Sequence, residues 1–336
     1  MKIAVDALGG DYAPAEVIKG AVQACQAMPD CQIILVGDEA KVRAELAKYP
    51  PQKNISIVHG PENISMDEHP LQAVRTKKDA SINVGLKLVK DKKADGFISA
   101  GNTGAVMASA LLTLGRVKGI ERPAIASVFP TKTGNTVLLD IGANADSRPS
   151  HLLQFAQMGS LYAQKVLNKD NPTIGLLNIG EEDEKGNELT QATNQLMRQT
   201  PINFKGNNEG KDNIEGLVDV VVCDGFVGNE VLKLAEGLSQ TMFAEIKKMV
   251  KKNIFSMLGA LLMMTTLNKF RKRFDYQEYG GAPLLGVDGI CIITHGRAKA
   301  KAIKNAIRMV KIAADHGFLE ALHDMKLIGV KQNAGV

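Results

Sequence analysis

The sequence predicts a three-layer α/β/α fold, and two observations carry the prediction. Segments typical of strands and of helices alternate along most of the 336 residues. Several strand segments, such as Gln32 to Val36, are continuous apolar runs, which is typical of strands covered by helices on both faces. Hydrophobic residues make up 45% of the chain, which is enough for a large core. We therefore expect one large α/β domain over residues 1–330, either undivided or in two lobes.

The expected elements follow from apolar periodicity and from the Gly, Pro, Asn and Asp residues that punctuate it. Strands are expected at residues 2–6, 32–36, 54–58, 95–99, 124–128, 135–140, 173–178, 219–223 and 290–293. Helices are expected at residues 14–28, 39–48, 81–91, 103–114, 150–168, 187–199, 226–252 and 297–314. Residues 240–280 differ in composition, since they are rich in Met, Leu and basic residues. We expect this segment to be an amphipathic helical protrusion from the domain.

Composition and motifs exclude several classes of function. The net charge of +5 is modest, and no basic patch is interleaved with aromatic residues, so nucleic-acid binding is not expected. The chain starts directly as a strand, so no signal peptide is expected. The longest apolar stretch, Ile254 to Leu267, is too short to span a bilayer. The four cysteines have no zinc-binding spacing, which predicts a reduced cytoplasmic protein without a metal.

Four strand-like runs each end at a loop of Gly, Asn and Asp residues. The loops are Ala100 to Gly104, Asp140 to Asp146, Asn178 to Gly186 and Asp224 to Asn229. Ligands of open α/β sheets bind at the carboxyl ends of the strands, and glycine lets backbone amides approach an anion closely. We therefore expect the four loops to lie on one edge of the sheet and to form one composite phosphate site.

The loop at Asn102, Thr103 and Gly104 opens a helix, and we expect phosphate to bind there. The alternative is that Asn102 or Thr103 only caps the helix, and both roles are compatible. Lys185 is the only cation in the four loops, so Lys185 and Asn229 are the candidates to stabilise an oxyanion. Asp224 is expected to orient one of these two side chains.

Other polar residues are candidates to support the site. Each of them could instead have a purely structural role. Carboxylates repel phosphate, and a single His or Arg at the end of a strand is often structural. These residues are Asp6, Gly9, Gly10, Asp11, Arg122, Asn144 and His295.

The segment from 253 to 274 joins apolar residues to basic clusters at both ends. Met and Leu at helical spacing favour a core or dimer interface, but flanking cations are also typical of a helix lying in a membrane surface. The same patch could instead contact an acidic partner such as a carrier protein. The candidate contact residues are Leu258, Leu261, Leu262, Lys269, Arg271, Lys272 and Arg273.

Several motifs taken together resemble the PlsX family of bacterial phosphate acyltransferases. The matching segments, in order, are Asp6 to Pro14, Ser99 to Gly104, Leu139 to Ala145, Leu176 to Gly186, Val222 to Asn229, Tyr279 to Ala282 and His295-Gly296. The resemblance covers roughly residues 1–315. Tyr12 departs from it, because family members commonly have His at that position.

The resemblance implies transfer of an acyl group from an acyl-carrier-protein thioester to inorganic phosphate, without a cofactor. It also implies a homodimer with a fold like that of isocitrate and isopropylmalate dehydrogenases and phosphotransacetylases. The acyl phosphate would feed phospholipid synthesis through a membrane glycerol-phosphate acyltransferase. These expectations place the protein in the cytoplasm, peripherally attached to an anionic membrane surface.

Two other functions are compatible with an α/β fold. The first is an NAD-dependent oxidoreductase of related fold, against which the missing Gly-x-Gly-x-x-Gly fingerprint argues. The second is a non-catalytic scaffold at the membrane. Phosphate-dependent release of a free carrier thiol would distinguish the acyltransferase from both.

Overall fold

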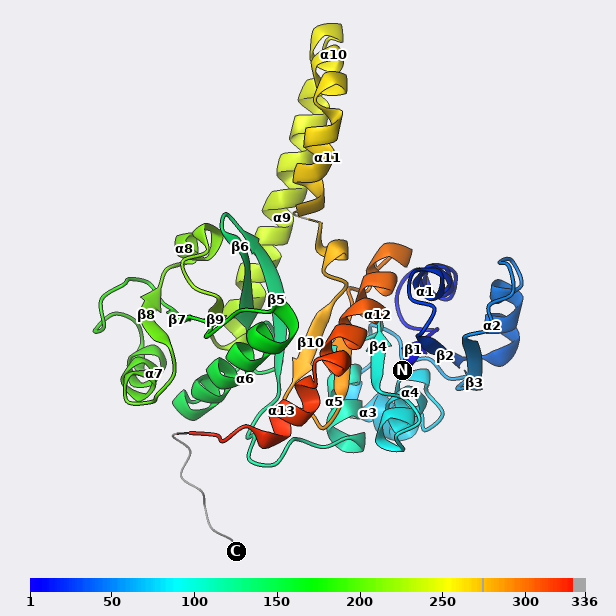
Figure 1. Ribbon diagram of the computed structural model, residues 1–336, viewed down its shortest axis with the longest axis horizontal. Coiled ribbons are helices and arrows are strands. Elements are labelled where there is room, and N and C mark those ends of the chain that lie inside the picture. The colour runs from blue at the N-terminus through cyan, green and yellow to red at the C-terminus, as the bar shows by residue number, and fades with distance from the viewer. Residues whose placement is uncertain (274, 329–336) are drawn as a thin grey trace, which may run out of the picture.

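The computed structural model describes residues 1–273 and 275–328, and a single mixed sheet runs through it (Figure 1). The strands of this sheet lie in the order β3-β2-β1-β4-β11-β10-β5-β6-β9-β7-β8. Their bounds are β1 Lys2–Asp6, β2 Gln32–Gly37, β3 Ile55–His59, β4 Gly96–Ser99, β5 Ala124–Thr131, β6 Gly134–Leu139, β7 Ile174–Leu177, β8 Phe204–Asn208, β9 Val220–Val222, β10 Ala282–Leu285 and β11 Ile290–Ile293. Strands β8 and β10 were not among the expected elements.

Helices follow most strands, as the alternating pattern predicts. Their bounds are α1 Ala15–Ala27, α2 Glu39–Leu46, α3 Pro70–Thr76, α4 Ser81–Lys90, α5 Thr103–Thr113, α6 Pro149–Leu167, α7 Glu188–Arg198, α8 Gly210–Glu215, α9 Gly225–Val250, α10 Ile254–Leu262, α11 Met264–Arg273, α12 Ala300–Asp315 and α13 Phe318–Asp324. Side-chain caps start several of them, including Asn102 at α5 and Asp224 at α9. The short helices α3, α8 and α13 were not expected, since they are too short to show a clear period.

Helices cover both faces of the sheet because successive strand residues point to opposite sides. Ile33 and Leu35 of β2 belong to a buried cluster that includes apolar residues of α1, α6 and α12. Ile34 and Val36 of the same strand belong to a second cluster that includes residues of α4 and α5. The continuous apolar runs thus fill two cores, one on each side of the sheet.

Strand direction reverses in the middle of the sheet. Strands β1, β2, β3, β4 and β11 are parallel to one another. β10 is antiparallel to both β11 and β5, and β5 is antiparallel to β6. Because β6, β9, β7 and β8 are again parallel to one another, these four strands run opposite to β4. The carboxyl ends of the two halves therefore lie at opposite edges of the sheet.

A helical hairpin of α9, α10 and α11 projects from the body of the molecule (Figure 1). The Phe243 and Phe270 rings meet edge to face, with centroids 6.0 Å apart, and join α9 to α11. At the base, Arg273 Nη2 donates to the carbonyl oxygens of Thr131 and Lys132 in the β5–β6 turn. The apolar stretch expected as one helix is divided at Met263, whose amide closes α10 by bonding to the Gly259 carbonyl.

Two glycines of α9 provide a matched test of how this helix packs. A Cβ at Gly228 would lie 1.9 Å from the Asp140 carbonyl oxygen, whereas a Cβ at Gly237 would meet nothing within 4 Å. We expect Gly228→Ala to lower the free energy of unfolding by about 1–3 kcal/mol or more through overpacking. Gly237→Ala is expected to raise it by up to about 1 kcal/mol, because alanine favours a helix.

Urea unfolding of both variants, at one protein concentration, measures these changes. Equal stability of the two variants would contradict close packing of α9 on the loop after β6.

Candidate functional site

The loops after β1 and β4 are joined by a buried carboxylate. Asp6 is 1% exposed and accepts hydrogen bonds from the amides of Leu8 and Gly9 and from Ser99 Oγ, the last at 2.6 Å. Ser99 Oγ in turn accepts from the Gly101 amide at 3.0 Å. Burial raises the pKa of Asp6, while these donors oppose the rise. Asp6 thus holds two loops together and does not face solvent.

The start of α5 presents amides to solvent beside these loops. Thr103 is exposed, and neither the Thr103 amide nor the Gly104 amide has a protein acceptor within the described ranges. A helix N-terminus with open amides and a favourable dipole can bind an anion. We call the loop residues Asp6 to Asp11 and Ser99 to Gly104, with His295, the α5 site.

The Asn102 side chain has the capping role, which is one of the two roles expected from the sequence. Its Oδ1 accepts from the Ala105 amide, and its Nδ2 lies within hydrogen-bond distance of the carbonyl oxygens of Ser65, Met66 and Glu68. The side chain is 8% exposed, so it caps α5 and holds the loop that precedes α3. Any anion at this place would meet backbone amides and Thr103, because the Asn102 amide group is already bonded.

His295 ends β11 at the same edge of the sheet as the α5 amides, since β11 is parallel to β4. Its Nδ1 accepts from the Arg297 amide, and burial lowers its pKa, so the imidazole is neutral near pH 7. Next to it, the Asp11 amide bonds to the Gly296 carbonyl at 2.8 Å, and the Gly10 φ of 98° makes this approach possible.

A second buried carboxylate organises the loop after β6. Asp140 is fully buried and accepts from the amides of Ile125, Gly142, Ala143 and Asn144 and from Asn144 Nδ2. Burial raises its pKa, although these donors stabilise the charged form. Asn144 also donates to the Pro123 carbonyl, and its own carbonyl accepts from the Gly225 amide. Asn144 therefore joins the loop after β6 to Pro123 through its side chain and to the start of α9 through its carbonyl.

Asn229 is the open polar side chain of this region. A Cβ at Gly142 would lie 3.8 Å from the Asn229 side chain, so Asn229 faces the loop after β6. Asp224 caps α9 by accepting from the Val227 amide at 3.0 Å. In the part of the chain that the structure describes, Asn229 has no hydrogen bond from its side-chain amide, which leaves two N–H donors available. We call residues Asp140 to Asn144 and Asp224 to Asn229 the α9 site.

Lys185 lies in the loop after β7, at the same edge of the sheet as the α9 site, because β7 and β9 are parallel. The Asn178 side chain fixes the loop by donating to the Lys185 carbonyl at 3.0 Å. The Lys185 side chain is exposed, and no ion pair to it occurs among residues 1–273 and 275–328. Its ammonium group is therefore available to an anionic ligand.

The expectation of four loops on one edge was wrong. The loop after β4 leaves one edge of the sheet, and the loops after β6, β9 and β7 leave the other, because the strand direction reverses between them. Within one chain, Lys185 and the α9 site follow strands of one half of the sheet, and the loops of the α5 site follow strands of the other half. The α9 helix nevertheless approaches the α5 site, since the charges of its Lys233 and Glu236 are near enough to affect the pKa of His295, which burial lowers. These residues are one to two turns beyond Asn229.

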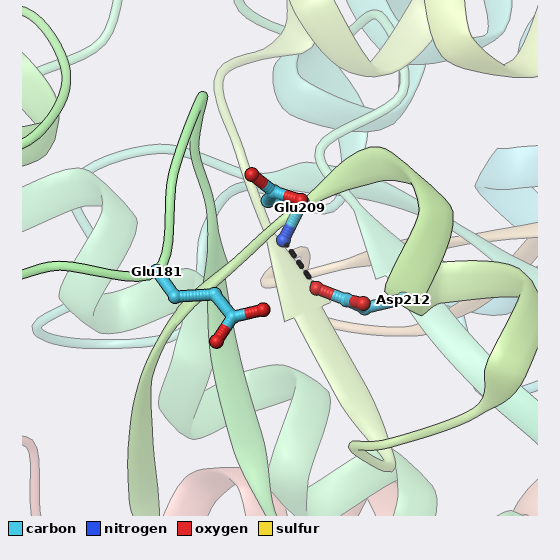
Figure 2. A group of neighbouring side chains, drawn as sticks. All are labelled: Glu181, Glu209 and Asp212. Carbon is cyan, nitrogen blue, oxygen red and sulfur yellow. Dashed lines mark hydrogen bonds between the residues drawn. The ribbon is translucent and has the colours of Figure 1, made fainter.

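An acidic group lies beside the Lys185 loop. Glu181, Glu209 and Asp212 approach one another so that one oxygen from each lies within 4.8 Å of the others (Figure 2). Asp212 Oδ2 accepts from the Glu209 amide at 2.9 Å, as part of the cap of α8, and the Glu209 carboxylate pairs with Lys211. Capping engages Asp212 and pairing with Lys211 engages Glu209, so we assign no metal to this group.

A cavity of about 760 Å³ lies beside the α9 site and was not expected from the sequence. It is lined by residues from the end of α5, the segment before β5, the loop after β6 and the start of α6. Of its residues only Arg122 was a candidate. The other lining residues are single polar residues in separate segments, so the sequence did not indicate that they lie together.

Comparison with known proteins assigns the family. The description of the matching family is "Fatty acid synthesis protein", and it matches residues 1–321. A phosphate acyltransferase of Desulfitobacterium hafniense is 52% identical over 323 residues, covering 96% of both chains. One from Pelotomaculum thermopropionicum is 52% identical over 336 residues, covering 100% of this chain and 98% of that one. The chain belongs to this family, PlsX. It is an acyltransferase.

Solved structures with similar folds have low sequence identity. The phosphotransacetylase EutD of Staphylococcus aureus aligns with a TM-score of 0.60 at 16% identity, covering 93% of this chain and 94% of that one. A 4-hydroxythreonine-4-phosphate dehydrogenase of Klebsiella pneumoniae aligns with a TM-score of 0.52 at 14% identity, covering 92% and 96%. At these identities the likeness concerns the fold, a large mixed α/β sheet.

Proposed function

We propose that this PlsX-family protein transfers a fatty acyl group from an acyl-carrier-protein thioester to inorganic phosphate. The full-length similarity to proteins named phosphate acyltransferase carries the proposal. A fold like that of isocitrate and isopropylmalate dehydrogenases is part of this proposal. The low-identity likeness to a 4-hydroxythreonine-4-phosphate dehydrogenase gives no reason to prefer redox chemistry. The acyl phosphate is the activated donor for a membrane glycerol-phosphate acyltransferase in phospholipid synthesis.

The state of the cysteines supports direct attack by phosphate on the thioester. All four cysteines are buried, and burial raises the pKa of Cys25 to about 11 and of Cys291 to about 12. Burial also raises the pKa of Cys31, and that of Cys223 is well above its usual value. A thiolate nucleophile on the enzyme is therefore not favoured, and phosphate needs positioning more than activation.

In the proposed reaction a phosphate oxygen attacks the thioester carbonyl carbon, and the carbonyl electron pair moves onto oxygen. The tetrahedral oxyanion then collapses, the carbon–sulfur bond breaks, and the carrier thiolate leaves and takes up a proton. The open amides of Thr103 and Gly104 hold the phosphate. Lys185 and the Asn229 amide stabilise the oxyanion, with Asp224 holding the start of α9 in place.

Turnover is tested by phosphate-dependent release of carrier thiol from purified acyl carrier protein. We expect Lys185→Ala and Asn229→Ala to lower kcat by about 10² to 10³, as for loss of one oxyanion donor. Lys205→Ala, at an exposed lysine of the adjacent strand β8, is the matched control and should keep full activity.

Thiol release that does not depend on phosphate would contradict the proposed function. Full turnover by a folded Lys185→Ala protein would remove Lys185 from the mechanism.

The position of the two sites at opposite edges of the sheet supports a homodimer in which each active site is shared. The α9 helix carries a stripe of exposed apolar residues at helical spacing, which is typical of a helix that packs on a partner. These residues are Val227, Leu234, Leu238, Met242, Ile246 and Met249. A two-fold pairing along α9 would bring the α9 site and Lys185 of one subunit to the α5 site of the other.

A heterodimer of two inactive variants tests the shared site. Thr103→Glu places a carboxylate among the α5 amides, where it repels phosphate but suits the helix dipole. Lys185→Ala removes the proposed oxyanion-stabilising ammonium group at the opposite edge of the sheet. With two different affinity tags, the purified heterodimer has one site free of both changes, so we expect about half of the wild-type activity.

Both homodimers, purified in the same way, are the controls and should be inactive. A heterodimer no more active than its parents would show that the two sites do not combine across subunits.

The hairpin supports attachment to an anionic membrane surface. Within the described residues no helix is long and apolar enough to cross a bilayer. Leu258, Leu261 and Leu262 at the tip are 52%, 60% and 87% exposed. Lys269 and Lys272 are also exposed, whereas Arg273 bonds to the β5–β6 turn and the Arg271 side chain lies outside the described set. Exposed apolar residues beside cations suit an interfacial helix, at about 1 kcal/mol per cation.

Flotation with anionic vesicles tests this surface. We expect binding at low salt that weakens as salt is added, because the cations are exposed to screening. Leu262→Glu should reduce the bound fraction, whereas Leu217→Glu, at a leucine that is 64% exposed outside the hairpin, should not. Equal binding by the two variants would contradict attachment through the hairpin.

A further inference from the structure

The cavity beside the α9 site is built from segments that the reversed sheet brings together. The end of α5 contributes Leu111, the segment before β5 contributes Arg116 to Pro123, and the loop after β6 continues into the first turn of α6. The Asn144 side chain joins two of these segments by donating to the Pro123 carbonyl at 2.8 Å. The cavity has a volume of about 760 Å³, which lies within the range of about 300–1,000 Å³ for sites of small organic ligands.

The charges that line the cavity favour an anion. Arg116, Arg122 and Arg148 line it, and none of the three is within ion-pair distance of a carboxylate in the described ranges. Two acids, Glu121 and Asp146, also line it. With three arginines and two acids, these lining side chains have a formal net charge of +1.

The Glu121 carboxylate is already engaged, since it meets His151 Nε2 at 3.2 Å and accepts from Ser150 Oγ at 3.3 Å. Burial lowers the pKa of His151, which keeps this imidazole neutral near pH 7. Asp146 is exposed and has no ion-pair partner in the described part of the chain. Arg122 and Arg148 are exposed as well, so their guanidinium groups can reach a ligand.

The start of α6 and Ser147 also line the cavity. The 19-residue helix α6 begins at this wall, with Arg148 as its N-cap and Pro149 in its first turn, so its dipole favours an anion there. Ser147 Oγ is inaccessible to solvent and has no hydrogen-bond partner among the described residues. A buried hydroxyl without a partner is costly, so rotation of the Ser147 side chain toward a ligand oxygen in the cavity would be favourable.

We propose that this cavity binds a phosphate ester that carries a short organic tail. Arg122, Arg148 and the Ser147 hydroxyl hold the phosphate, and the tail lies against Leu111 and Pro123. The volume is large for inorganic phosphate alone, and the apolar residues give the tail a surface. Under the proposed function, on which this assignment of the source rests, the ester is the prosthetic arm of the carrier protein. A free phosphorylated metabolite has the same chemistry.

Calorimetric titration of the full-length protein tests the site without any turnover. The probes are 4′-phosphopantetheine, pantetheine and inorganic phosphate. We expect 4′-phosphopantetheine to bind about tenfold or more tightly than either of the others, because only it presents both phosphate and tail. Arg122→Gln combined with Arg148→Gln should weaken it by about tenfold or more.

Arg308→Gln, at an exposed arginine of α12 outside the cavity, is the matched control and should bind the ester like the wild type. Circular dichroism and thermal unfolding of the variants exclude misfolding as the cause. Equal binding of pantetheine and its phosphate ester would overturn the proposal, as would inorganic phosphate binding as tightly as the ester or ester binding unchanged in the double variant.

Steady-state kinetics then separate the two sources of the ester. If the carrier arm occupies the cavity, the double variant raises KM for the acylated carrier and leaves KM for phosphate unchanged. If a free ester is the ligand, KM for the carrier is unchanged while the ester still binds to the wild type. Either result supports the site, and failure of the thiol-release assay would affect the proposed function without changing the binding result.

Discussion

The functional arrangement of this molecule depends on the reversal of strand direction at the centre of its sheet. Three successive antiparallel pairings, from β11 through β10 and β5 to β6, turn one half of the sheet against the other. Loops that follow parallel strands share an edge, so the reversal divides the glycine-rich loops into two groups. The long helix α9 starts in one group and carries a stripe of exposed apolar residues along its length.

Both groups of loops are organised in the same physical way. A carboxylate that is almost fully buried, Asp6 in one and Asp140 in the other, accepts several backbone N–H groups and draws its loop into a tight shape. Burying a charge is costly unless donors surround it, so these loops are held firmly. The groups left open at their rims are the Thr103 amide, Asn229 and Lys185, which are the groups proposed to act on an anionic substrate. Rigid support of this kind is what electrostatic stabilisation of an oxyanion requires.

Away from these loops, basic residues occur in two different settings, the helical hairpin and the cavity near α6. On the hairpin, exposed lysines accompany exposed leucines, which suits a lipid surface that is both apolar and anionic. In the cavity near α6, arginines accompany a helix N-terminus and a buried hydroxyl, which suits a compact phosphate group.

The sequence by itself determined the fold class and most of the longer elements, because buried strands such as β2 and long helices such as α9 leave clear apolar patterns. It also marked Lys185, Thr103 and Asn229, whose side chains the structure leaves open. It could not determine strand direction, since β10 is four residues long and an apolar run reads the same in either direction. It also could not show that the Asn102 side chain bonds both to the start of α5 and to the loop before α3. Nor could it show that Arg116, Ser147 and Arg148 line one cavity. Only tertiary structure decided these points, because each depends on contacts between residues far apart in the chain.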